Sequence, residues 1–140
     1  MLSNRCIYAL KAVLELAKHE GFGLVTITDI AKAQGIPARF LETILIQLKQ
    51  QGYCSSVRGK EGGYRLAKPA KAITVGQIVR IFQRPLASGE HRGKKNHGDV
   101  FEEIWAKAET ALSSVLDSVK FDRLAERDRS RALQSGDFVI

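Results

Sequence analysis

Two short segments of the chain carry residue types that can recognise a nucleic-acid duplex. Arginine donates two hydrogen bonds to guanine, a carboxylate accepts one from the cytosine amino group, and the threonine methyl group contacts thymine. Residues 37–43 combine all three types in Arg39, Glu42 and Thr43, and residues 58–65 contain three cations and three glycines. The candidate DNA-contacting residues are Thr28, Pro37, Ala38, Arg39, Phe40, Glu42, Thr43, Arg58, Gly59, Lys60, Gly62, Gly63, Tyr64 and Arg65.

Phe40 and Glu42 also fit purely structural roles. Phe40 can pack against a neighbouring helix, and Glu42 can be a solvated surface charge. In the second segment, Gly59 stands between Arg58 and Lys60, where a small residue allows an arginine to enter a narrow minor groove. A structural hairpin also needs glycines, but it does not need so much positive charge.

The first segment lies at the start of the second helix of a predicted helix-turn-helix. Ser3 can cap an initial core helix, and Thr26 to Asp29 has the form of a helix start that leads to an end at Gly35. Pro37 then opens a further helix, where its missing N–H costs nothing, and Gly52 ends that helix. Two helices joined by a short turn with glycine are typical of a helix-turn-helix. The inward stripe of the second helix consists of Leu41, Ile44, Leu45 and Leu48.

The second segment is predicted to be a β-hairpin that follows the helix pair. Residues 53–58 and 64–66 have strand character, and the turn at 59–63 holds three glycines that are free to adopt positive φ. Thr74 to Gln77 forms a capping box for a helix that ends before Pro85. These elements together predict a winged helix-turn-helix in a mainly helical α+β fold.

The C-terminal part of the chain is predicted to pair two copies. A long helix from Asp99 carries two adjoining apolar stripes, and only one of them can cover the core of its own chain. A second copy is the economical partner for the other stripe. The predicted dimer contacts are Phe101, Ile104, Trp105, Ala108, Ala111, Leu112, Val115, Leu116 and Val119.

The expected domain organisation follows from these elements. A winged helix-turn-helix domain occupies residues 1–83, and a flexible basic loop without apolar periodicity occupies residues 84–98. Residues 99–133 form the dimerisation helix with its two apolar stripes and a further short helix, and residues 134–140 form a tail.

The charge distribution favours a polyanionic partner. The 140 residues carry a net charge of +7 and a pI of about 9.6, although such a charge also serves solubility. Residues 1–98 contain 16 basic and 6 acidic residues, whereas residues 99–140 contain 6 basic and 9 acidic ones. No apolar run approaches the ~20 residues of a membrane span, and the N-terminus lacks a secretory signal. We therefore expect a cytoplasmic protein with no membrane partner.

The segment from Ser55 to Leu66 strongly resembles the wing of the Rrf-two (Rrf2) family of bacterial transcription regulators, because it contains the sequence Arg-Gly-x-x-Gly-Gly-Tyr. The similarity runs from about Ser3 to Leu124. Further segments that fit the family are residues 8–10, 30–36, 40–42 and 73–78. The resemblance implies a homodimer with crossing long helices, in which each winged helix binds one half-site of a palindromic promoter element.

The loop at 84–98 departs from the family pattern. The cluster-binding members carry three cysteines there, and this sequence has none. Thiolates are the usual ligands of iron–sulfur clusters, and His91 and His97 cannot replace three of them. We therefore expect no iron–sulfur cluster, no metal site and no other cofactor. Cys6 and Cys54 are expected to be buried and inert, with redox sensing as the alternative.

These features predict a cluster-free repressor that binds double-stranded DNA as a homodimer. The alternative is a winged-helix interaction module whose basic wing docks an acidic protein partner. The cations of the loop can bind a small anionic effector, add phosphate contacts or stay solvated, and the family resemblance also implies enzyme partners. An enzyme is not predicted, because residues 59–63 lack the Gly-Lys-Ser/Thr ending of a phosphate-binding loop.

Overall fold

The computed structural model describes residues 2–85 and 100–134, which form a mainly helical α+β fold as predicted. The expected loop beyond residue 85, the helix start at Asp99 and most of the expected tail lie outside these residues. The elements are α1 (Asn4–Lys18), α2 (Ile27–Gln34), α3 (Ala38–Gln50), β1 (Cys54–Val57), β2 (Gly63–Leu66), the 3-10 helix η1 (Ala70–Ala72), α4 (Val75–Phe82), α5 (Val100–Asp117) and α6 (Phe121–Gln134).

The predicted helix starts are confirmed by their capping hydrogen bonds. The Ser3 hydroxyl accepts a hydrogen bond from the Cys6 N–H at 3.1 Å, and the Thr26 hydroxyl accepts one from the Asp29 N–H at 3.1 Å. Thr74 forms a complete capping box with residue 77, as its sequence pattern predicts. These bonds join residues three positions apart, so the N-terminal ends of α1, α2 and α4 are marked by local interactions.

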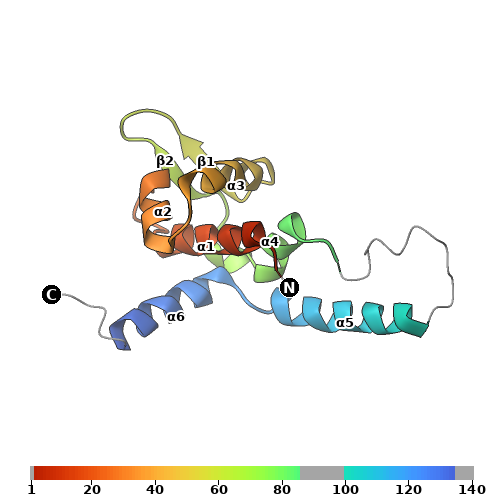
Figure 1. Ribbon diagram of the computed structural model, residues 1–140. Coiled ribbons are helices and arrows are strands. Elements are labelled where there is room, and N and C mark those ends of the chain that lie inside the picture. Colours follow the sequence, from red (N-terminus) through yellow and green to blue (C-terminus); the bar gives the residue numbers. More distant parts are fainter. Residues whose placement is uncertain (1, 86–99, 135–140) are drawn as a thin grey trace.

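Helix α1 lies at the centre of the core. It packs against α2 and α3 on one side and against α6 on the other, and its N-terminal half contacts α4 (Figure 1). The stripe predicted for α3 is fully buried against this centre. The largest fully buried side chains are Phe121, Leu16, Ile30, Leu41, Ile44, Leu45, Leu48, Ile73, Ile78, Val13 and Cys6.

The hairpin is an antiparallel pair in which Cys54 lies opposite Leu66 and Val57 lies opposite Gly63. A third segment joins it, because Val25 exchanges two backbone hydrogen bonds with Tyr64 at 2.8 and 2.7 Å. The sequence pattern gave no sign of this bridge. It attaches the base of the wing to the segment that leads into α2.

Of the three turn glycines, which are all free to adopt positive φ, only one does so. Gly59 has φ of 113°, but Gly62 and Gly63 do not have positive φ. A side chain at Gly62 would instead overlap the carbonyl oxygen of Val57, and a Cβ at Gly63 would lie 2.7 Å from the carbonyl oxygen of Val25. Glycine is required at these two positions because the backbones approach closely.

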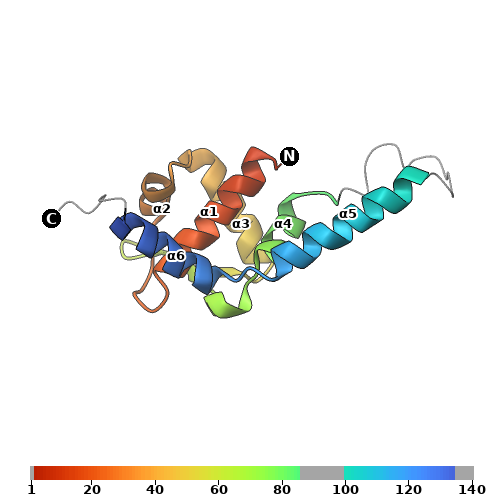
Figure 2. The same ribbon diagram turned by 90° about the horizontal axis from the view of Figure 1, so that it is seen from below.

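Helix α6 is longer than the short helix expected, with 14 residues, and it is part of the core. Phe121 is 1% exposed and Ala125 is 2% exposed. The core therefore extends beyond the domain expected at residues 1–83. Helix α5 has no buried residue and runs away from this core (Figure 2). Within the described residues, none of the helices could span a lipid bilayer.

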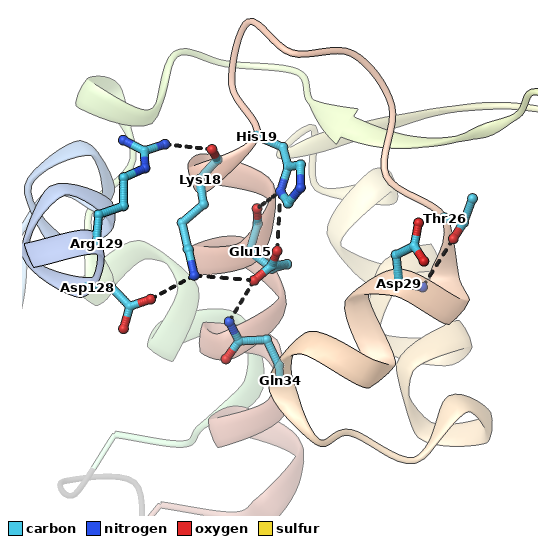
Figure 3. Close-up of polar contacts among 8 residues, drawn as sticks. All are labelled: Glu15, Lys18, His19, Thr26, Asp29, Gln34, Asp128 and Arg129. Atoms are coloured by element: carbon cyan, nitrogen blue, oxygen red, sulfur yellow. Dashed lines mark hydrogen bonds and ion pairs between the residues drawn. The ribbon is translucent and has the colours of Figure 1, made fainter. Parts of the chain in front are cut away.

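A polar network joins α1 to α2 and α6 (Figure 3). The carboxylate of Glu15 is buried in α1 and accepts a hydrogen bond from Gln34 of α2 at 2.9 Å. Lys18 lies 3.8 Å from the same carboxylate and 2.9 Å from that of Asp128 on α6. Arg129 donates to the carbonyl oxygen of Lys18. A buried charge needs such partners, because its desolvation is otherwise uncompensated.

We expect Phe121→Ala to lower the free energy of unfolding by about 3–5 kcal/mol, since it removes a fully buried aromatic ring. Leu133→Ala is the matched control on the same helix, because Leu133 is 62% exposed. Urea denaturation followed by circular dichroism measures both. Equal stability of the two variants would show that α6 is not part of the cooperative core.

Candidate nucleic-acid interface

The second helix of the helix-turn-helix, α3, has one buried face and one solvent face. The left-handed Gly35 ends α2, and Ile36 is buried in the turn that leads to Pro37. Pro37 is the N-cap residue of α3 and not its first helical residue, so the helix begins one residue later than predicted, at Ala38. Because the apolar stripe of α3 faces α1, the polar side chains of α3 face outward.

A groove of about 580 Å³ separates this outer face of α3 from the wing. It contains seven of the candidate DNA-contacting residues, of which Glu42 comes from α3 and the other six come from the wing. Its walls are Thr26, Ile27, Glu42, Ile46, Lys49, Ser56, Val57, Arg58, Gly59, Lys60, Gly62, Gly63 and Tyr64. The two segments singled out by their chemistry therefore meet at one surface.

Ile46 and Lys49 line the groove but were missed by the sequence analysis. Ile46 is 47% exposed in the middle of α3, where an apolar side chain can contact a thymine methyl group. Lys49 donates a hydrogen bond to the Ser56 hydroxyl at 2.7 Å and so ties α3 to β1. Both positions follow Glu42 at helical spacing, so extending the helix period from Glu42 would have identified them.

Phe40 lies outside the groove and packs against α1. Its ring stacks on Tyr8 at a centroid distance of 6.2 Å, and the Arg39 guanidinium lies 4.7 Å from the centroid of the Phe40 ring. Phe40 thus packs in part, as one alternative predicts, but it is 44% exposed and stays a candidate DNA contact. The stacked ring supports Arg39, which is exposed at the start of α3. Thr43 is also exposed, and its hydroxyl donates to the Phe40 carbonyl at 3.0 Å.

The remaining candidates do not line the groove. Pro37 and Ala38 are exposed at the N-terminus of α3, and Thr28 is exposed in the first turn of α2. Arg65 follows Tyr64 on β2, and successive strand side chains point to opposite faces. Since Tyr64 lines the groove, Arg65 lies on the other face of the ribbon.

Both cysteine thiols are buried, as expected. Burial raises the pKa of Cys54 to about 11 against the partly opposing effect of Lys49, and burial also raises the pKa of Cys6. The Cys54 thiol lies 3.5 Å from the carbonyl oxygen of Leu45. Burial of the ring raises the pKa of Tyr64 most strongly, and the nearby ionisable groups of Cys54 and Glu42 raise it further.

Comparison with known proteins decides the family. The family model Rrf2, described as an iron-dependent transcriptional regulator, matches residues 2–127. The chain belongs to the Rrf2 family. This match confirms the family resemblance that the wing sequence indicated. The curated relatives described below are named as transcriptional regulators and not as enzymes.

Two curated relatives and one solved structure illustrate the similarity. A putative rrf2-like regulator of Rhodobacter capsulatus is 40% identical over 90 residues, which span 62% of this chain and 60% of the relative. CymR of Bacillus subtilis is 32% identical over 89% of this chain and 88% of CymR. The structure of IscR from T. potens superposes with a TM-score of 0.78 at 31% identity, over 93% of this chain and 90% of IscR. This Rrf2 protein is a DNA-binding transcription regulator with a winged helix-turn-helix.

Arg58 at the tip of the wing provides a direct test of this surface. We expect Arg58→Ala to weaken DNA binding by about 1–3 kcal/mol, the usual value of one good arginine–base contact. The control is Arg127→Ala on α6, across α1 from the wing (Figure 1). Fluorescence anisotropy with a labelled duplex measures both affinities. If the Arg58 variant binds as tightly as the wild type, Arg58 is not part of the interface.

Proposed function

We propose that this Rrf2 protein is a cytoplasmic repressor that binds a palindromic promoter element as a homodimer and holds no iron–sulfur cluster. The observation that carries the DNA-binding part is the groove in which the outer face of α3 meets the cationic wing. A helix of this kind places its N-terminal residues against base edges in the major groove, while the wing contacts the backbone or the minor groove. The repressor blocks transcription by occupying the promoter.

The apolar surface of α5 supports the homodimer. None of the nine residues predicted as dimer contacts is buried within one copy of the chain. Phe101, Ile104 and Trp105 are 55%, 51% and 48% exposed, and the rings of Phe101 and Trp105 stack at 6.3 Å. Val115 is 62% exposed toward the other end of the helix. Apolar groups exposed along a whole helix mark an association surface, and a second copy covers them by symmetry.

A homodimer presents two copies of the DNA-binding surface that are related by a twofold axis. Two recognition helices related by a twofold axis bind half-sites about one helical turn apart, ~34 Å from centre to centre. The operator is therefore a palindrome. Phosphate contacts from both wings make the affinity fall steeply with salt, because each contact releases counterions.

The donor set supports a protein without a cluster, although the family description refers to iron. An iron–sulfur cluster is held by several cysteine thiolates. This chain has only Cys6 and Cys54, and both are buried in the core on different elements. Burial raises the pKa of both thiols, which disfavours the thiolate form that binds iron. Among the residues that the structure describes, no three metal-ligating side chains lie together. These residues do not fit the cluster.

A selected palindrome tests the proposed function together with the dimer. We expect the wild-type chain to sediment as a dimer and to prefer a palindrome selected from random DNA over bulk DNA at physiological salt. Trp105→Glu places a charge on the exposed stripe, so it should yield a monomer that binds the palindrome much more weakly. The control is Leu133→Glu, which places the same charge at another exposed apolar position, on α6.

Several outcomes would contradict this proposal. If the wild-type chain is a monomer, the proposed dimer is wrong. If no DNA sequence is preferred, the proposed specific DNA binding is wrong. In the latter case, a wing that captures an acidic protein would establish the interaction module instead. A brown protein that contains iron after anaerobic purification would contradict the absence of a cluster.

The cysteines provide a test by pH. Burial raises the pKa of Cys54 from 9.0 to about 11, so the folded state favours the neutral thiol. The free energy of unfolding should then be unaffected by this thiol below pH 9 and should fall by about 2 kcal/mol as the pH rises toward 11. Cys54→Ala should show a smaller fall in urea denaturation over the same range. Identical pH profiles would show that the Cys54 thiol is accessible to solvent.

Alkylation gives an independent check of the same inference. Iodoacetamide at pH 8 should label neither cysteine in the native chain and both cysteines after unfolding, because only the accessible thiolate reacts. Mass spectrometry counts the labels. Rapid native labelling of either residue would favour the redox-sensing alternative.

A further inference from the structure

A compact joint connects the end of α5 to the start of α4. The Val75 N–H donates to the Val119 carbonyl at 2.9 Å, and the Phe121 N–H donates to the Ile73 carbonyl at 3.0 Å. Thr74 and Lys120 form an isolated β-bridge between these two bonds. The three residues that link α5 to α6 are therefore held against the N-terminus of α4.

An ion pair completes this joint. Arg80, in the last turn of α4, donates to both carboxylate oxygens of Asp117, the last residue of α5, at 2.6 and 3.3 Å. Both side chains are partly exposed, so the pair adds little to overall stability. A bidentate pair nevertheless fixes the mutual orientation of the two groups, because the two planar ends must align. It acts on the direction of α5 relative to α4.

Gly76 provides the space that this pair needs. Gly76 is buried in the first turn of α4, and its φ is not positive, so the helix itself does not require glycine there. A Cβ at this position would overlap the Asp117 carboxylate and would lie 3.2 Å from the Arg80 guanidinium. The carboxylate therefore occupies the space that any other side chain would fill.

The joint fixes the C-terminal end of α5, and farther along the helix Leu112 and Leu116 line an apolar pocket together with residues of α1 and α4. Helix α5 projects from the body beyond the joint in both views (Figures 1 and 2), and it has no buried residue along its length. Its 18 residues extend about 27 Å. A tilt of about 10° at the joint would move the far end by about 5 Å, which exceeds the ~3.4 Å rise of one base pair.

We propose that the Arg80–Asp117 ion pair, seated on Gly76, sets the distance between the two DNA-binding surfaces of the dimer and so determines which half-site spacing it accepts. The proposal rests on the proposed dimer, whose two copies meet through α5. Arg80 and Asp117 are positioning residues, since they lie on the joint and not in the groove between α3 and the wing. They act on specificity through geometry.

A series of duplexes tests this role with the full chain. Each duplex carries the selected palindrome with its spacer unchanged, or shortened or lengthened by one or two base pairs, and one duplex carries a single half-site. The variants are Asp117→Asn, which keeps the shape of the side chain, and Gly76→Ala, which displaces it. The matched control is Asp128→Asn, which breaks the Lys18 ion pair between α1 and α6 and leaves the joint intact.

The wild type should favour one spacer, and both joint variants should reduce that preference about fivefold while half-site affinity and dimer mass stay unchanged. Asp128→Asn should keep the wild-type preference. Joint variants with an unchanged spacer preference would overturn the proposal, as would an equal loss of affinity on the half-site. If Gly76→Ala does not fold, Asp117→Asn decides alone.

The binding of the wild-type chain to the same duplexes distinguishes a failure of this inference from a failure of the proposed function. A dimer that binds palindromes of every spacing equally well refutes the role of the joint but keeps the regulator. A chain that binds no DNA sequence specifically refutes both.

Discussion

The burial of α1 among the other helices of the body is the constraint on which the rest of the structure depends. Helix α1 packs against α2, α3, α4 and α6 at once. Because α3 commits its apolar stripe to this centre, its opposite face must remain in solvent, where Glu42, Ile46 and Lys49 lie. The outward polarity of α3 thus follows from the hydrophobic effect acting on its other side. The burial of the apolar stripe of α3 in the core therefore determines which face of the helix is available to DNA.

The wing adds positive charge to this surface and is attached to it by backbone contacts. Gly63 allows β2 to approach the Val25 backbone, and the Lys49–Ser56 hydrogen bond connects α3 to β1. These contacts hold the wing against α3 and against the segment that leads into α2. A duplex meets one preformed surface, and little ordering of the protein has to accompany binding.

Features with local causes were predictable from the sequence, and features with long-range causes were not. The caps at Ser3, Thr26 and Thr74 depend on neighbours a few residues away, so their patterns identified the helix starts. The Val25–Tyr64 bridge and the burial of Phe121 depend on segments that are distant in sequence. The glycines of the wing were recognised, but two of them serve close packing and not positive φ.

The same distinction applies to the candidate site. Arg58, Glu42 and Tyr64 were identified by residue type, and the groove brings them together. Phe40 could not be assigned from sequence, because only the position of Tyr8 shows that its ring packs. Where α5 meets the body, residues 73–75 and 119–121 bond directly across the interval between the two described ranges.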